Sequence, residues 1–291
     1  MSDSSAATPG VDPETVAWML RNEADMSFRM RARTVFEWVP LRPDSLILDL
    51  PCGQGFYLKM LRHVCDCHLL GLDLDAAVLK KAQGRLGRAP GLLLGRSDAL
   101  ALPLPPDCVD AIILTELLEH VRDDLAVLRE CQRVLKPGGV MAITVPHANY
   151  PLAWDPINKT LEKLFGLHIR SGPLAGIWAN HLRLYTPGQL RERVHAAGLQ
   201  VDEERSLLHH AFPFSHNLVY GLGKPLLQAG LLPEALADVA DRSRFARVDG
   251  SPLNPLRLAL HVLEWFDRNN AMDEAPGRST VNLALRASKP L

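Results

Sequence analysis

Short apolar runs alternate with amphipathic stretches between residues 46 and 145. Apolar runs of strand length occur at 47–50, 68–72 and 109–114. Apolar residues at helical spacing occur at 75–83 and 123–135. Because strands that alternate with helices form βαβ units, this pattern predicts a parallel sheet with helices on its faces.

Further elements are predicted on both sides of this region. Apolar residues spaced three or four apart predict a helix over 13–38, which would cap a ligand site, and residues 1–12 are expected to be a disordered tail. Arg31 and Arg33 of this helix could reach a ligand carboxylate or be solvated surface charges. A helix over 187–197 and strands at 199–201 and 280–287 are predicted after the alternating region.

The first strand leads into a glycine loop. Asp49 lies at the end of the apolar run, and Gly53 and Gly55 follow it. Glycine tolerates the backbone angles and the close approach that a cofactor loop requires, and a helix that begins near Gly55 would direct free N–H groups at a ligand. A nicotinamide-binding loop would have a third glycine, in the pattern G-x-G-x-x-G, where this chain has Leu58.

The spacing D-x-x-x-G-x-G from Asp49 to Gly55 resembles motif I of the class I S-adenosylmethionine-dependent methyltransferases, with Pro51 where the family has glycine. Four further segments over residues 44–146 resemble the family in the same order: a strand ending in Asp73, the segment 95–100, the strand 109–114 with Thr115, and the sequence LKPGG at 135–139 before a fifth strand.

The resemblance implies an α/β, Rossmann-like class I methyltransferase fold with a seven-stranded, mostly parallel sheet. It also implies S-adenosyl-L-methionine as the cofactor, with Asp73 on the ribose and Asp98 on the adenine amino group. The full set of cofactor-binding residues that it implies is Asp49, Gly53, Gly55, Asp73, Asp98, Ala99 and Thr115.

Glu116, Glu119 and His120 follow the fourth strand and would share one face if this stretch is helical. Two carboxylates beside an imidazole suit general acid/base catalysis or metal ligation. The pattern E-x-x-E-H, with a later histidine ahead of a threonine-led helix, resembles small-RNA 2′-O-methyltransferases and ubiquinone-pathway O-methyltransferases.

This second resemblance implies Mg²⁺ or Mn²⁺ held by Glu116, Glu119, His120 and His181, with the ion gripping neighbouring oxygens of the acceptor. The alternative is a metal-free transfer in which His120 and Glu119 are the catalytic residues and His181 packs in a lid.

Two segments are additions to the core fold of the family. The core is expected at 13–208 and 278–291, with an inserted lid segment at 147–186 and a helical lid insertion at 209–277, between two strands that form a hairpin in the family. Both additions are rich in leucine and aromatic residues. They would form a lid with its own core, line an apolar acceptor pocket or rest on a membrane surface.

Composition narrows the possible partners. The formal net charge of −1 over 291 residues argues against a nucleic-acid partner, and no apolar run is long enough to span a bilayer. The first residues lack a basic start and an apolar stretch, so a cytoplasmic protein is expected. The five cysteines have no framework spacing and are expected to be reduced.

The sequence therefore predicts an S-adenosylmethionine-dependent methyltransferase of secondary metabolism that methylates a hydroxyl group on a small or lipophilic metabolite. A metal-free N- or C-methyltransferase is the first alternative, and a non-catalytic cofactor-binding accessory protein and a nicotinamide oxidoreductase are the others. The expected partner is a small-molecule acceptor, with peripheral membrane contact through the lid as a further expectation.

Overall fold

A single seven-stranded sheet organises the chain, which we describe from a computed structural model at residues 11–21, 23, 25–214 and 255–291. Its strand order is β3-β2-β1-β4-β5-β7-β6. The strands are β1 (Leu46–Asp49), β2 (His68–Asp73), β3 (Leu92–Arg96), β4 (Val109–Thr115), β5 (Leu135–Pro146), β6 (Gln200–Leu207) and β7 (Asn282–Ser288). Strands β1 to β5 pair in parallel, and β7 is antiparallel to both of its neighbours. The expected mostly parallel, Rossmann-like sheet is confirmed.

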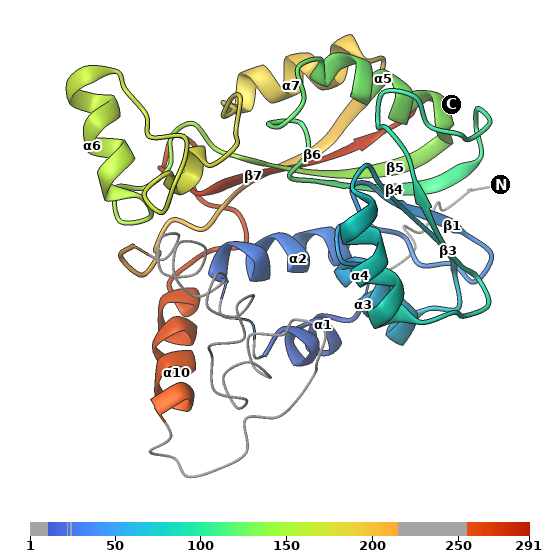
Figure 1. The fold of residues 1–291 in the computed structure, drawn as a ribbon, viewed down its shortest axis with the longest axis horizontal. Coiled ribbons are helices and arrows are strands. Elements are labelled where there is room, and N and C mark those ends of the chain that lie inside the picture. Colours follow the sequence, from blue (N-terminus) through green and yellow to red (C-terminus); the bar gives the residue numbers. More distant parts are fainter. Residues whose placement is uncertain (1–10, 22, 24, 215–254) are drawn as a thin grey trace, which may run out of the picture.

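Helices cover both faces of the sheet (Figure 1). One face carries α1 (Pro13–Leu20), α2 (Met26–Trp38), α3 (Phe56–Val64) and α4 (Ala76–Leu86), and the other carries α5 (Asp124–Val134) and α7 (Pro187–Ala196). Because successive side chains of a strand point to opposite faces, Ile47 packs into the core beneath α1, α2 and α3, and Leu48 packs into the core beneath α5 and α7. The continuous apolar runs of the strands follow from this burial on both sides.

The single helix predicted over 13–38 is wrong, since the structure has α1 and α2 in its place. Asp25 begins the second helix, because its carboxylate accepts the backbone N–H of Phe28. Of the predicted tail, residues 1–10 lie outside the described residues. Val11 is buried, and its N–H bonds to Phe36 O, while Asp12 caps α1.

Both additions to the sheet lie at the same end of the molecule (Figure 1). The segment 147–186 contains α6 (Pro156–Phe165) and a short 3-10 helix (Gly176–Trp178). The connection between β6 and β7 contains α10 (Pro255–Arg268), and residues 215–254 of the predicted 209–277 insertion lie outside the described part of the chain. Within the described residues, every helix is too short or too polar to cross a membrane.

The expectation that all five cysteines are reduced is wrong for one pair. Cys65 and Cys67 form a disulfide in the short connection between α3 and β2. Their Cα atoms are 5.3 Å apart, within the range that a disulfide can bridge. Cys52, Cys108 and Cys131 are free thiols.

Candidate active site

The glycine loop after β1 forms an open cradle at the carboxyl ends of the strands. Gly53 has a φ of +52° and open space where a side chain would be. Gly55, with a φ of +78°, is the N-cap of α3, and a Cβ there would lie 2.6 Å from the side chain of Leu86. Only glycine fits both the backbone angle and the close packing of Gly55, whereas at Gly53 the missing side chain leaves room for a ligand.

Asp49 is buried at the start of this loop without a protein partner. Its exposed fraction is 0%, and neither carboxylate oxygen has a hydrogen-bond partner. Burial, and then the nearby charge of Asp73, raise the pKa of the Asp49 carboxyl well above its usual value. A buried polar group without a partner is costly, and such groups occur where a ligand completes the site.

The other residues implied for the cofactor follow neighbouring strands. Asp73 ends β2, and its carboxylate accepts the N–H groups of Gly53 and Asp75, both at 2.9 Å. Thr115 ends β4, and Asp98 and Ala99 come directly after β3. Because β3, β2, β1 and β4 are consecutive in the sheet, these residues gather along one edge, where α/β folds bind ligands.

Glu119, His120 and His181 form a compact cluster beyond the end of β4. The Nε2 atoms of His120 and His181 are 3.8 Å and 4.0 Å from Glu119 Oε1. One potential ligand atom from each residue lies within 4.8 Å of the others, which is a candidate arrangement for a metal ion. The structure thus brings together three of the four residues that the sequence suggested as metal ligands.

The carboxyl group of Glu119 is fully buried, and both of its oxygens lack hydrogen-bond partners. Burial is the main cause that raises its pKa well above the usual value, and the charge of Glu116 adds to the effect. His120 is partly exposed, and its Nδ1 lies 3.0 Å from the carbonyl oxygen of Asn180. Because a carbonyl only accepts, Nδ1 carries the proton, and the Nε2 lone pair faces the cluster.

The helix assumed for residues 116–120 is absent, because the chain forms a turn there. Glu116 adopts a left-handed conformation with a φ of +53°, and the N–H of His120 bonds to Leu117 O. The carboxylate of Glu116 is engaged by other partners. Its Oε1 lies 3.4 Å from Arg31 Nη1 and accepts a hydrogen bond from Thr144 Oγ1 at 3.1 Å.

Arg31 is buried on α2 and faces the site, so a solvated surface charge is the wrong interpretation of this residue. Arg33 is half-buried, and burial lowers the pKa of its guanidinium. Two residues that the sequence did not single out also lie here. Tyr57 is buried close to Arg31, and Asn282 accepts the hydroxyl of Ser27 while its amide reaches Glu116 at 3.4 Å.

Comparisons with known proteins agree with this geometry. The family profile of the methyltransferase domain matches residues 48–143. A 2-phytyl-1,4-naphtoquinone methyltransferase of Synechococcus elongatus is 37% identical over 142 residues, which cover 47% of this chain and 59% of that protein. A trans-aconitate 2-methyltransferase of Methylobacterium nodulans is 26% identical, with 74% of this chain and 81% of that protein covered.

The fold also matches solved structures. An S-adenosylmethionine-dependent methyltransferase from Mesorhizobium loti has a TM-score of 0.51 and 18% identity, with 89% of this chain and 97% of that chain covered. The chain spans less than two thirds of the length of the naphtoquinone methyltransferase named above. The chain therefore contains a methyltransferase domain at residues 48–143, in the fold of the class I S-adenosylmethionine-dependent methyltransferases.

Proposed function

We propose that this protein transfers a methyl group from S-adenosylmethionine to a hydroxyl group of a small, lipophilic metabolite. The observation that carries the proposal is a pair of buried carboxyl groups without hydrogen-bond partners, Asp49 in the glycine cradle and Glu119 in the histidine cluster. Asp49 is the last residue of β1 and Glu119 follows β4, at the carboxyl ends of neighbouring strands in a methyltransferase fold. Two such groups at the ends of neighbouring strands fit a cofactor site beside a proton-transfer site.

The cofactor fits the residues of the cradle. The methionine end of S-adenosylmethionine carries an ammonium group, and the partnerless carboxyl of Asp49 is its natural counter-charge. Asp73 keeps acceptor capacity for ribose hydroxyls, and Gly53 leaves open space for close approach. Thr115, Asp98 and Ala99 would complete the site along the same sheet edge.

When bound, the cofactor supplies a sulfonium methyl group that is already a strong electrophile. The protein's contribution is then mainly to position the acceptor, which can lower a barrier by about 7–11 kcal/mol. A hydroxyl acceptor must also lose a proton. His120 can accept it at Nε2, because Nδ1 is held as the donor to Asn180 O and the imidazole is partly exposed. Glu119 beside it would stabilise the imidazolium that forms.

A divalent cation, Mg²⁺ or Mn²⁺, is the finer part of the proposal. Glu119, His120 and His181 offer one oxygen and two nitrogen ligands, and the cation would lower the pKa of an acceptor hydroxyl bound to it. Glu116 would join the set only if it left Arg31 and turned toward the cluster. The rival mechanism is a metal-free transfer to oxygen, nitrogen or carbon that uses the same histidine as base.

The names of two of the relatives support a lipophilic acceptor. The naphtoquinone methyltransferase is named for a substrate that carries a phytyl chain, and a relative from Amycolatopsis mediterranei that matches over 36% of this chain is named 27-O-demethylrifamycin SV methyltransferase. We extend from these names only the chemical class, an oxygenated ring compound with apolar substituents.

Calorimetric titration of Mn²⁺ into protein saturated with S-adenosylhomocysteine tests the metal. We expect stoichiometric binding that Glu119→Ala abolishes and that Glu116→Ala preserves, because Glu116 is engaged by Arg31. Loss of binding in both variants would instead indicate a four-ligand site. Absence of binding to the wild-type protein would contradict the metal and leave His120 as the base of a metal-free transfer.

Release of S-adenosylhomocysteine, measured by mass spectrometry with a lipophilic catechol or naphthoquinol as acceptor, tests the transfer itself. We expect His120→Ala to lower the rate by about 10²–10⁴-fold without weakening cofactor binding. A His120→Ala variant that is as active as the wild type would contradict the role of this imidazole.

A further inference from the structure

Helix α6 presents its polar side to the protein and its apolar side outward. Its Glu162 carboxylate accepts the hydroxyl of Tyr150 at 2.9 Å, and Asn158 is fully buried beneath the helix. Ile157 and Leu161 instead line a shallow apolar groove of about 360 Å³. A surface helix of a globular protein normally packs its apolar stripe on the core, so this orientation leaves an apolar stripe free for another surface.

The end of α6 and the loop after it carry three exposed apolar side chains. Leu164, Phe165 and Leu167 are 64%, 66% and 62% exposed. Asn158 fixes this tip, because its side-chain oxygen accepts the N–H of Ile169 at 2.7 Å. Its amide nitrogen donates to the carbonyl oxygens of Leu174 and Ala175 and to the carboxylate of Asp155. The tip is therefore a defined part of the fold that displays large apolar groups.

A second set of exposed aromatic rings lies on α10 and the segment after β6. Trp265 is 62% exposed, and its ring stacks edge-on to Phe266 with centroids 5.0 Å apart. The ring of Phe212 packs against the ring of Phe266, with centroids 5.8 Å apart. Phe214 lines the groove beside α6, and its N–H bonds to Ala153 O.

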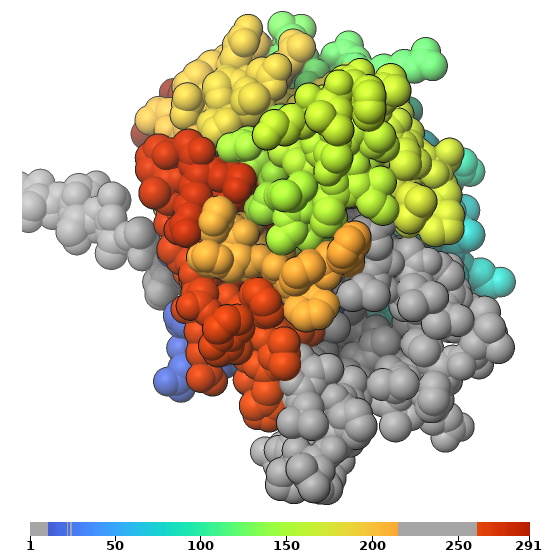
Figure 2. Space-filling model, turned by 90° about the vertical axis from the view of Figure 1, so that its left-hand side faces the viewer, coloured from blue at the N-terminus to red at the C-terminus, as the bar shows by residue number. Residues whose placement is uncertain are grey.

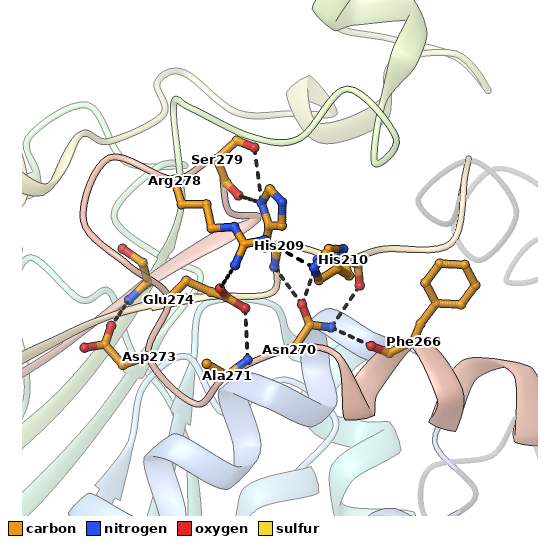
Figure 3. A network of polar contacts seen from close by, with 10 residues as sticks. His209, His210, Phe266, Asn270, Ala271, Asp273, Glu274, Arg278 and Ser279 are labelled. Atoms are coloured by element: carbon orange, nitrogen blue, oxygen red, sulfur yellow. Dashed lines mark hydrogen bonds and ion pairs between the residues drawn. The ribbon is translucent and has the colours of Figure 1, made fainter.

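A polar clamp holds these two segments together (Figure 3). The side-chain oxygen of Asn270 accepts the N–H groups of His209 and His210, at 2.9 Å and 2.7 Å. Its amide nitrogen donates to the carbonyl oxygens of His210 and Phe266. The end of α10 and the segment after β6 are therefore fixed to one another, and so are their aromatic rings.

These elements form one side of the molecule. Figures 1 and 2 show α6, the segment 208–214 and α10 next to one another on this side. We define the apolar face as the exposed side chains on these three elements, namely Leu164, Phe165, Leu167, Phe212, Phe214 and Trp265. An apolar area spread over three fixed elements is typical of a binding surface.

We propose that the apolar face docks on the surface of a lipid bilayer that contains anionic lipids. The charges of α6 and its loop select this partner. Lys163 and Arg170 are the exposed charged side chains of residues 150–182, and both are positive. The acidic residues there are engaged: Asp155 is buried and accepts the side-chain amide of Asn158, and Glu162 accepts the hydroxyl of Tyr150.

Basic residues beside inserted leucine and aromatic side chains are the features of an interfacial membrane helix. Tryptophan favours the same interface, because its ring is apolar and its N–H is polar. Docking by this face would bring the two insertions of the fold to a membrane in which a lipophilic acceptor is dissolved. The inference does not rest on the proposed function, since lipid binding requires neither cofactor nor acceptor.

Co-sedimentation of the full chain with large unilamellar vesicles tests the proposal. We expect binding to vesicles of phosphatidylcholine and phosphatidylglycerol that is stronger than binding to phosphatidylcholine alone and that weakens with salt. The double variant Phe165→Ser, Leu167→Ser should bind at least about tenfold more weakly, because two apolar side chains no longer insert. Lys163→Gln with Arg170→Gln should remove the preference for the anionic vesicles.

Leu93→Ser is the matched control, because Leu93 is 66% exposed but lies on β3, away from the apolar face. It should bind vesicles like the wild type, and equal melting temperatures would show that all variants are folded. Wild-type protein that stays in the supernatant with both vesicles would overturn the proposal. A double variant that sediments with vesicles like the wild type would also overturn it. The same holds if vesicles are not bound and light scattering shows a wild-type dimer that the double variant does not form.

Discussion

Replacing Asp49 by asparagine should weaken cofactor binding and at the same time stabilise the ligand-free protein. The substitution keeps the shape of the side chain and removes its charge. Because neither oxygen of Asp49 bonds to the protein, no internal hydrogen bond is lost. What is lost is the charge-assisted contact with the cofactor's ammonium group, which contributes about 1.5–3 kcal/mol. The Kd for S-adenosylhomocysteine should therefore rise roughly 10- to 150-fold.

The effect on stability has the opposite sign. Burial raises the pKa of the Asp49 carboxyl in the folded protein, so above pH ~3.9 the folded state retains a proton that the unfolded state has lost. The free energy of unfolding therefore falls as the pH rises from that value toward the folded pKa. Asparagine does not titrate, so at pH 8 the substitution removes a penalty on folding on the order of 1–3 kcal/mol from the buried carboxyl. The melting temperature of the variant should therefore exceed that of the wild type by at least about 2 °C.

Isothermal titration calorimetry and thermal melting between pH 4 and pH 8 measure both effects. The difference in melting temperature between the two proteins should shrink toward pH 4. Asp44→Asn is the control, since it removes the same charge from an exposed position just before β1. An Asp49→Asn variant that is less stable than the wild type would contradict this prediction, because the carboxyl would then have a structural partner. Unchanged affinity would refute its role in binding.

Three further predictions concern stability. His147 is buried against the hydroxyl of Thr280, and burial lowers the pKa of its imidazole to about 4. The free energy of unfolding of the wild type should therefore fall by about 2 kcal/mol as the pH falls from 6.5 toward 4. Chemical unfolding of His147→Asn should lack this pH-dependent loss. Gly176→Ala would place a Cβ on the Asp155 carboxylate, so the free energy of unfolding from calorimetric melting should fall by about 3 kcal/mol. An unchanged melting temperature would contradict the close packing of Gly176 on Asp155. Gly71→Ala would put a Cβ 2.5 Å from a leucine of α3. The free energy of unfolding measured in urea should fall by about 1–3 kcal/mol. An unchanged free energy would show that this leucine moves aside freely.

The sheet and the cofactor edge could be predicted because their signals are local. Apolar runs of strand length mark β1, β2 and β4, and glycines at positive φ mark the loop where β1 turns into α3. Their order then brings Asp49, Asp73 and Thr115 to one edge, since the carboxyl ends of parallel strands meet there.

The details of the histidine cluster depend on contacts that are distant in sequence. Helical spacing placed Glu116 with Glu119, whereas the structure turns Glu116 toward Arg31 and Asn282. A left-handed backbone at a glutamate has no signal in a single sequence, and the partners that compensate for it come from α2 and β7. His181 still reaches Glu119, because the N–H of Leu182 bonds to Glu119 O and ties the insertion to the turn.

The sequence also did not show where the second helix begins or which charged side chains are buried. The apolar spacing of residues 13–38 continues across the break before Asp25, so only the capping contact to Phe28 shows where the second helix begins. The sequence left undecided whether Arg31 faces a ligand or solvent, because a charged residue on a helix gives no indication of which face is buried.

Calorimetric titration of S-adenosylhomocysteine into the protein, beside the same titration with NAD⁺, shows which cofactor the cradle after β1 binds. We expect stoichiometric binding of S-adenosylhomocysteine, weakened by Asp73→Ala as well as by Asp49→Asn, and no binding of NAD⁺. Binding of NAD⁺ in place of S-adenosylhomocysteine would contradict this expectation and would make the cradle after β1 a nicotinamide site.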